Sequence, residues 1–84
     1  MIPVQRQIEE IIDQLKQDDG VVVGLRVDLF ESGVLDSFRM LEYISELERV
    51  FGITISNDDL IPQNLWTIEA TALLVERYLE AVNP

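Results

Sequence analysis

Apolar residues recur at helical spacing in three stretches of the sequence. The first stretch runs from Val4 to Leu15, with apolar side chains at i, i+4, i+7 and i+11, which is the pattern of one buried helix face. Pro3 suits the first turn of this helix, because its missing N–H would have no partner there. The turn-forming run at 18–20 predicts where the helix ends.

The second periodic stretch extends from about Asp36 to Phe51, and Gly52 follows it at the place of a C-terminal cap. The third begins near Thr67, a good N-cap residue, and extends to Val82. The predicted core stripes are Val4, Ile8, Ile11, Ile12 and Leu15 in the first helix, Met40, Ile44, Leu47 and Phe51 in the second, and Ile68, Ala72, Val75 and Leu79 in the third, with Tyr78 and Val82 alongside.

Two long connections join these helices. The first contains three valines at 21–23, which have no second strand of similar strength to pair with, so we expect an ordered loop that places valine, Leu29 and Phe30 on the core. The sequence of the second connection, residues 53–66, predicts one short helical turn, at 58–60 or at 62–65. The expected fold is all-α: a small four-helix bundle of three main helices and one short one, with a long loop between helices 1 and 2, in one domain spanning residues 1–84.

Composition narrows the range of partners. Of the 84 residues, 48% are hydrophobic, which favours a packed core over a disordered acidic tail. The net charge is −10 and is spread along the chain, so nucleic-acid phosphates and anionic membrane surfaces are repelled and basic protein surfaces are attracted. No apolar stretch is long enough to span a bilayer, and the N-terminus lacks the order of a signal peptide. We therefore expect a cytoplasmic protein, monomeric, without nucleic-acid partners or membrane insertion.

The absence of cysteine and histidine argues against an enzyme. It excludes disulfides, thiolate nucleophiles, Cys-ligated metals and Ser-His-Asp triads. A calcium loop over residues 28–39 also fails, because Phe30 and Arg39 stand where oxygen ligands are required. We expect neither catalytic residues nor a metal site in this chain.

The second helix carries an apolar residue on its polar side. With Met40 set at 0° and 100° per residue, Phe38 lies at about 160° and Leu41 at about 100°. An apolar side chain in this place indicates a partner surface, although Phe38 folding back under a loop is an equally good interpretation. The polar side chains expected on the same solvated face are Arg39, Glu42, Ser45, Glu46 and Arg49.

Ser37 follows Asp36 at the start of this helix. An Asp-Ser pair is ordinary helix-capping chemistry, but a helix N-terminus also favours a phosphate group. Ser37 cannot act as a nucleophilic catalyst, since no His, Cys or nearby Lys is available to activate it. Any chemistry at this serine must be performed by another protein.

The run around this serine resembles the attachment segment of the acyl and peptidyl carrier proteins. The resemblance rests on Asp28-Leu29-Phe30-Glu31-Ser32-Gly33-Val34-Leu35-Asp36-Ser37-Phe38, and it continues through 40–55, 58–60 and 64–68 at the spacing that this family uses. It covers the chain from about residue 4 to residue 82. The long combined motif is far more specific than the Asp-Ser pair alone.

The resemblance implies a four-helix carrier with covalent 4′-phosphopantetheine on Ser37. A phosphopantetheinyl transferase would take the group from coenzyme A with Mg²⁺ and release 3′,5′-ADP, and Asp36 would help to position the metal and the phosphates. The thiol of the arm would carry an acyl or aminoacyl thioester from a loading enzyme to a downstream synthase. Partner enzymes would bind the second helix through Phe38, Leu41, Glu42, Ser45 and Glu48.

Three positions depart from the fatty-acid carriers of this family. Phe38 replaces the usual Leu or Met, Arg39 is basic where those carriers are acidic, and Ser45 is polar where they are apolar. These departures favour a free-standing carrier of a natural-product pathway, polyketide or nonribosomal peptide. D-alanyl carrier proteins share the same layout and remain an alternative. An unmodified acidic adaptor is a third possibility, which would keep its function in a Ser37→Ala variant.

Overall fold

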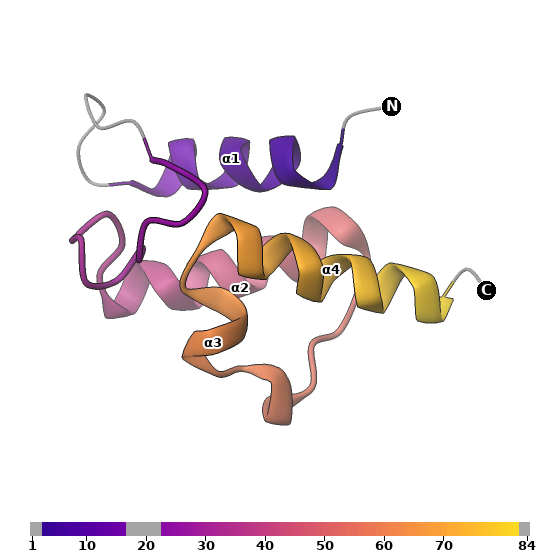
Figure 1. Ribbon diagram of the computed structural model, residues 1–84. Helices are drawn as coiled ribbons and strands as arrows, with labels where there is room; N and C mark the ends of the chain where they lie inside the picture. The colour runs from indigo at the N-terminus through magenta and orange to yellow at the C-terminus, as the bar shows by residue number, and fades with distance from the viewer. Residues whose placement is uncertain (1–2, 17–22, 83–84) are drawn as a thin grey trace.

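The computed structural model describes residues 3–16 and 23–82, and within them all regular secondary structure is helical (Figure 1). The elements, in chain order, are α1 (Val4–Leu15), α2 (Ser37–Phe51), the 3₁₀ turn η1 (Asn57–Asp59), α3 (Pro62–Leu65) and α4 (Ile68–Val82). The expected all-α bundle with a long loop after the first helix is confirmed. The sequence predicted one short turn, at 58–60 or at 62–65, whereas the structure has a turn at each place, η1 and α3.

Helix α1 packs across both α2 and α4, and α3 packs on α4 (Figure 1). One continuous core lies between them and takes side chains from every α-helix and from both long loops. Among the described residues, no helix is long and apolar enough to cross a bilayer. The buried apolar side chains are Ile8, Ile11, Ile12, Leu15, Leu29, Val34, Leu35, Met40, Tyr43, Leu47, Ile53, Ile55, Leu65, Ile68, Ala72, Leu74 and Val75.

Helix α1 ends at Leu15, because the backbone of Lys16 is extended. The turn-forming run at 18–20, which we expected to end this helix, lies outside the described residues. Two of the three loop valines also lie outside them, while Val23 is half-buried against the core as expected. Leu29 is fully buried, as predicted.

The predicted position of Phe30 on the core is wrong. Its side chain is 39% exposed and stacks on Trp66, with ring centroids 5.3 Å apart. The backbone explains the pairing, since the N–H of Leu29 donates to the carbonyl oxygen of Trp66 at 2.7 Å and brings the two rings together. The two aromatic side chains therefore cover each other, and of the two neighbours Leu29 and Phe30 only Leu29 is buried in the core.

The buried face of α2 is turned by part of a helical turn from the predicted stripe. Met40 and Leu47 are buried as expected, but Tyr43 is completely buried while Ile44 and Phe51 are only half-buried. At 100° per residue Tyr43 lies about 60° from Met40 on the side opposite Ile44. Both α1 and α4 pack against α2, and the tyrosine hydroxyl contacts Thr71 of α4.

Burying Tyr43 requires a partner for its hydroxyl group. The hydroxyl donates to Oγ1 of Thr71 at 2.9 Å, and Thr71, itself fully buried, has the carbonyl oxygen of Thr67 at 2.8 Å and that of Leu65 at 3.2 Å as acceptors. Burial raises the pKa of Tyr43 above its ordinary value. This relay joins α2 to α4 and to the end of α3.

The long loop before α2 is anchored at the start of α4. Thr67 is the N-cap that the sequence predicted, since its Oγ1 accepts the N–H of Ala70 at 3.0 Å. The N–H of Glu69 donates to the carbonyl oxygen of Leu25 at 3.0 Å, so the loop satisfies another free donor of the first turn. The loop is thereby held in place before it reaches the N-terminus of α2.

Candidate functional site

The candidate site is the N-terminal end of α2, which begins where the sequence predicts. Asp36 is its N-cap: the backbone is extended, and the carboxylate oxygen Oδ1 accepts the N–H of Arg39 at 2.8 Å. Among the described residues, the second oxygen of this exposed carboxylate has no hydrogen-bond partner. Capping therefore uses one oxygen of Asp36 and leaves the other open to solvent.

Ser37 is the first residue of α2, and its side chain is exposed. Within residues 3–16 and 23–82, no group hydrogen-bonds to its hydroxyl. Helix N–H groups that lack an intrahelical partner lie beside it, and with the helix dipole they favour a negatively charged group at this place. An anion attached to the hydroxyl of Ser37 would therefore be stabilised by the end of α2.

Several hydrogen bonds within the loop that leads to Ser37 fix its conformation. Oδ1 of Asp28 accepts the N–H groups of Phe30 at 3.0 Å and of Glu31 at 2.8 Å, and Gly33 follows with φ 81°, a conformation that favours glycine. The N–H of Leu35 then donates to the carbonyl oxygen of Leu29 at 2.9 Å. Because Leu29 and Leu35 are both buried, the chain must turn outward at the next residues, where the serine lies.

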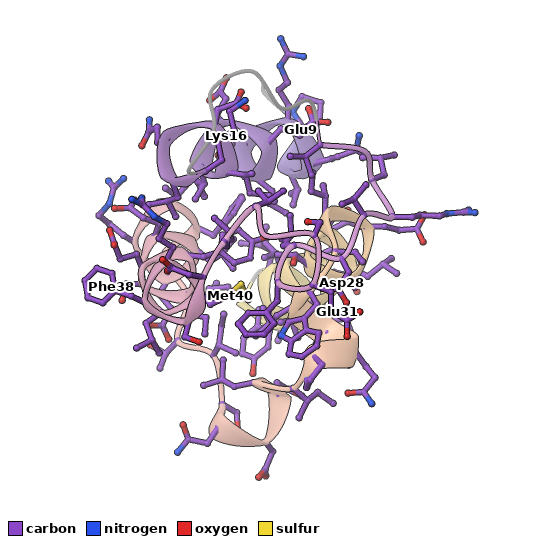
Figure 2. The ribbon with its side chains drawn as sticks, turned by 90° about the vertical axis from the view of Figure 1, so that its left-hand side faces the viewer. Glu9, Lys16, Asp28, Glu31, Phe38 and Met40 are labelled. Atoms are coloured by element: carbon purple, nitrogen blue, oxygen red, sulfur yellow. The ribbon has the colours of Figure 1, made fainter. Side chains whose placement is uncertain are left out.

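The exposed face of α2 is apolar beside this serine. Phe38 is 70% exposed and Leu41 is 66% exposed, and Figure 2 shows Phe38 pointing away from the rest of the molecule. Phe38 does not fold back under the loop. Ser45 is exposed and Glu42 is half-buried on the same side of the helix. These four residues lie on one side of the helix, which we call the α2 face (Phe38, Leu41, Glu42 and Ser45).

Two charged residues of α2 serve the fold itself. Arg39, expected on the solvated side, is half-buried, and its Nη1 donates to the carbonyl oxygen of Leu15 at 2.9 Å. That contact satisfies one of the free carbonyls at the C-terminus of α1, where a cation is also favoured. Glu48, expected to contact partners, is half-buried, and its Oε2 accepts the N–H of Ile55 at 2.9 Å.

The site has no catalytic machinery of its own. The sequence contains no histidine and no cysteine, so no imidazole or thiolate can activate the hydroxyl of Ser37. Among the described residues, no group of three or more acidic side chains is placed to hold a metal ion. What the geometry offers is an exposed serine at a helix N-terminus, next to a capping carboxylate and an apolar surface.

Comparison with known sequences identifies this arrangement. The profile of the family described as "Phosphopantetheine attachment site" matches residues 6–75, most of the chain. This chain belongs to that family. The carrier is therefore a member of a family that carries covalent 4′-phosphopantetheine and does not itself catalyse a reaction.

Curated relatives match between 61% and 98% of the carrier. The D-alanyl carrier protein of Lactococcus lactis subsp. cremoris (strain MG1363) is 33% identical over 73 residues, which are 87% of this chain and 92% of the relative. That of Bacillus cereus (strain B4264) is 30% identical over 82 residues, 98% of this chain and 99% of the relative. A third, from Bacillus velezensis, is 31% identical over 51 residues, 61% of this chain and 65% of the relative.

The end of α2 fits the group that this family carries. The phosphate of phosphopantetheine requires a free hydroxyl for its ester bond, and Ser37 provides one in an exposed position. A phosphate at this place would also benefit from the helix N–H groups that have no intrahelical partner, because α2 begins at Ser37. The arm supplies a thiol that forms thioesters, a nucleophile that the cysteine-free chain lacks.

Proposed function

We propose that Ser37 is the residue that receives 4′-phosphopantetheine. The observation that supports the proposal is the exposed hydroxyl of Ser37 behind the Asp36 cap, in a chain of the phosphopantetheine-attachment family. Oγ of Ser37 attacks the phosphorus on the pantetheine side of the coenzyme A pyrophosphate. The P–O bond to the other phosphate breaks, 3′,5′-ADP leaves with the electron pair, and a base of the transferase takes the serine proton.

Asp36 has two functions in this proposal. Oδ1 caps α2 through the N–H of Arg39 and so fixes the backbone on which Ser37 is presented. The open oxygen faces solvent, where it helps the phosphopantetheinyl transferase to hold Mg²⁺ next to the coenzyme A phosphates. Carboxylate oxygens are suitable ligands for this cation, which usually keeps most of its coordination for phosphates and water.

Intact-mass analysis tests the attachment site. The protein is incubated with a broad-specificity phosphopantetheinyl transferase, coenzyme A and Mg²⁺, and we expect one phosphopantetheinyl group per chain. Ser37→Ala should gain none, whereas Ser32→Ala, which removes an exposed serine from the loop before α2, should react fully. An adduct on the Ser37→Ala protein, or no adduct on the parent chain, would refute the proposal.

A pair of Asp36 variants separates the two functions of that residue. Asp36→Asn keeps an oxygen that caps the helix but removes the charge, while Asp36→Ala removes both. We expect both variants to be modified much more slowly than the parent chain, and only Asp36→Ala to lose about 1 kcal/mol of stability. If Asp36→Asn is modified at the parent rate, the carboxylate takes no part in metal positioning.

The cargo that we propose is a single amino acid, with D-alanine as the first candidate. The support is that the relatives cited above, which span nearly the same length, are named D-alanyl carrier proteins. A loading enzyme would activate the amino acid, and the carrier would present it as a thioester to a downstream enzyme. An acyl unit of a natural-product pathway is the second candidate, favoured by the polar Ser45 on the α2 face.

Loading assays distinguish these cargoes. The holo-protein is incubated with a D-alanine-activating ligase and ATP, and mass analysis should show a D-alanyl thioester that hydroxylamine removes. L-alanine with the same ligase is the control for stereochemistry, and a malonyl-transferring enzyme with malonyl-coenzyme A is the control for the second cargo. Loading with malonyl but not with D-alanine would reverse the assignment.

A further inference from the structure

Helices α3 and α4 leave an open groove between them, remote in sequence from Ser37. Its volume is about 440 Å³, at the lower end of the range that ligand sites in proteins occupy. That volume has room for one or two side chains of a partner. The groove is lined by Gln63 and Asn64 from α3 and by Ala70, Leu73, Leu74 and Arg77 from α4.

The apolar part of this groove belongs to α4. Ala70, Leu73 and Leu74 lie at i, i+3 and i+4 and so share one side of the helix. Leu74 is buried, but Leu73 is 61% exposed, which is close to the exposure of Phe38 and Leu41 on the α2 face. Nothing in the described part of the chain covers Leu73, so it offers contact area without contributing to the core.

Arg77 gives the groove a positive charge one turn beyond Leu73. In a chain with six basic and sixteen acidic residues, three of the other cations, Lys16, Arg26 and Arg49, form ion pairs with carboxylates. Arg77 is exposed and forms no ion pair with the residues that the structure describes. A carboxylate of a partner would therefore meet an available guanidinium group at this place.

The polar wall of the groove suits a peptide backbone. Gln63 is exposed, and Nδ2 of Asn64 donates to the carbonyl oxygen of Asp59 at 3.0 Å, which fixes that amide and leaves its oxygen as an acceptor. Side-chain amides can both donate to and accept from peptide groups. An anionic lipid surface and a second copy of this chain are poor occupants, because each would bring many negative charges against a chain of charge −10. A short segment with a single carboxylate brings one negative charge, which Arg77 can pair with.

We propose that the α3–α4 groove binds a short extended segment of a partner protein with the pattern Leu-x-Glu. Leu73 and Arg77 are four residues apart on a helix, a rise of about 6 Å. Alternate residues of an extended strand share one face and are about 6.7 Å apart, so a leucine and a glutamate two residues apart would meet Leu73 and Arg77 together. None of the lining residues belongs to α2, so the groove shares no residue with the α2 face.

A peptide titration tests the groove. The probe is acetyl-Ala-Leu-Ala-Glu-Ala-amide, added at millimolar concentration to the ¹⁵N-labelled Ser37→Ala chain and followed by amide chemical shifts. We expect concentration-dependent shifts at Gln63, Ala70, Leu73 and Arg77. The matched peptide with lysine in place of glutamate should bind about two- to fivefold more weakly, as an exposed ion pair allows. Because this protein cannot be phosphopantetheinylated at residue 37, the result is independent of the proposed function.

Variants make the test specific. Arg77→Glu should reverse the preference, so that the lysine peptide binds more tightly than the glutamate peptide, an effect that loss of structure cannot produce. Leu73→Asn should remove the shifts, whereas Leu41→Asn, at an equally exposed leucine on α2, should leave them unchanged. Shifts centred on Phe38 and Leu41, equal binding of the two peptides, or no shifts would each overturn the proposal.

Discussion

Helix α2 has two apolar faces with opposite surroundings. On the inner face, Met40, Tyr43 and Leu47 are buried against α1 and α4. On the outer face, Phe38 and Leu41 are mostly exposed, although their side chains are of similar size and polarity. The hydrophobic effect stabilises the fold through area removed from water, so the inner face contributes to folding and the outer face contributes little. The outer side chains remain available to stabilise a complex.

Arg39 and Glu48 lie between these faces. Arg39 binds the last carbonyl group of α1, and Glu48 binds the N–H of Ile55 in the loop after α2. Each charge is thus used within the carrier to fix the ends of neighbouring elements. The two faces are therefore best compared through their apolar residues, because α2 contains one buried leucine, Leu47, and one exposed leucine, Leu41.

Replacing Leu47 with alanine should give the largest effect on stability. The side chain is fully buried, so the free energy of unfolding should fall by about 2–5 kcal/mol from lost transfer energy and the cavity left behind. Leu41→Ala, on the outer face, should change it by no more than about 0.5 kcal/mol. Urea unfolding monitored by circular dichroism measures both values. Equal losses for the two leucines would contradict the division of α2 into two faces.

Removing the hydroxyl of Tyr43 should have the next largest effect. Tyr43→Phe breaks the hydrogen bond to Thr71 but keeps the ring in the core, and Thr71 retains its carbonyl acceptors. We expect a loss of about 1–2 kcal/mol in the free energy of unfolding. A double-mutant cycle with Thr71→Val measures the coupling directly, and additive losses would show that the two hydroxyls do not act together.

The same tyrosine makes stability depend on alkaline pH. Burial raises the pKa of Tyr43 in the folded state, so above the ordinary tyrosine pKa of about 10 the unfolded chain ionises while the folded chain does not. The contribution of Tyr43 to stability is fully present below pH 10, and above it stability should fall by about 1.4 kcal/mol per pH unit from this residue. Unfolding curves between pH 9 and about pH 11 give the slope.

Tyr78 provides the comparison for that slope. Its hydrogen bond to Asp59 raises its pKa as well, so part of the loss above pH 10 should remain in Tyr43→Phe. The slope should nevertheless become clearly smaller than in the parent chain. An unchanged slope would mean that the ionisation of Tyr43 is not linked to unfolding.

Helical periodicity and helix-capping residues were sufficient to predict most of the fold from the sequence. Asp36, Gly52 and Thr67 mark helix ends through local chemistry, so a single sequence suffices to place α2 and the start of α4. The angle of Phe38 on the helix placed it on the polar side, but its exposure was decided only by the structure, because folding back under the loop was an equally good interpretation of the sequence. The burial of Tyr43 did not follow from periodicity, because it depends on Thr71, 28 residues away, to satisfy the hydroxyl.

Contacts between residues far apart in the sequence also explain the other differences between the predictions and the structure. Phe30 leaves the core because its loop is bound to the backbone at Trp66, and Arg39 turns inward because the end of α1 offers a free carbonyl group. Neither partner is near in sequence, and neither contact produces a periodic signal. The groove between α3 and α4 has the same origin, since it exists only where two helices meet.

Phe38 should show the smallest effect on folding and a clear effect on reaction with partners. Phe38→Ala removes little buried area, so the free energy of unfolding should change by no more than about 0.5 kcal/mol. If the α2 face binds the loading enzyme, the value of kcat/KM for loading should fall about tenfold, as expected for an aromatic side chain at the centre of an interface. The control is Phe30→Ala, which removes another exposed phenylalanine from the loop before α2.

The kinetics of Phe38→Ala distinguish a lost contact with the partner enzyme from a disturbed position of Ser37. A lost contact raises KM for the carrier, whereas a disturbed serine lowers the rate of phosphopantetheine transfer and of loading together. We expect the rise in KM alone, because Asp36 and Arg39 fix the start of α2 without the side chain of Phe38. Parent-level loading of Phe38→Ala and Leu41→Ala would show that the outer apolar face of α2 is not used by that enzyme.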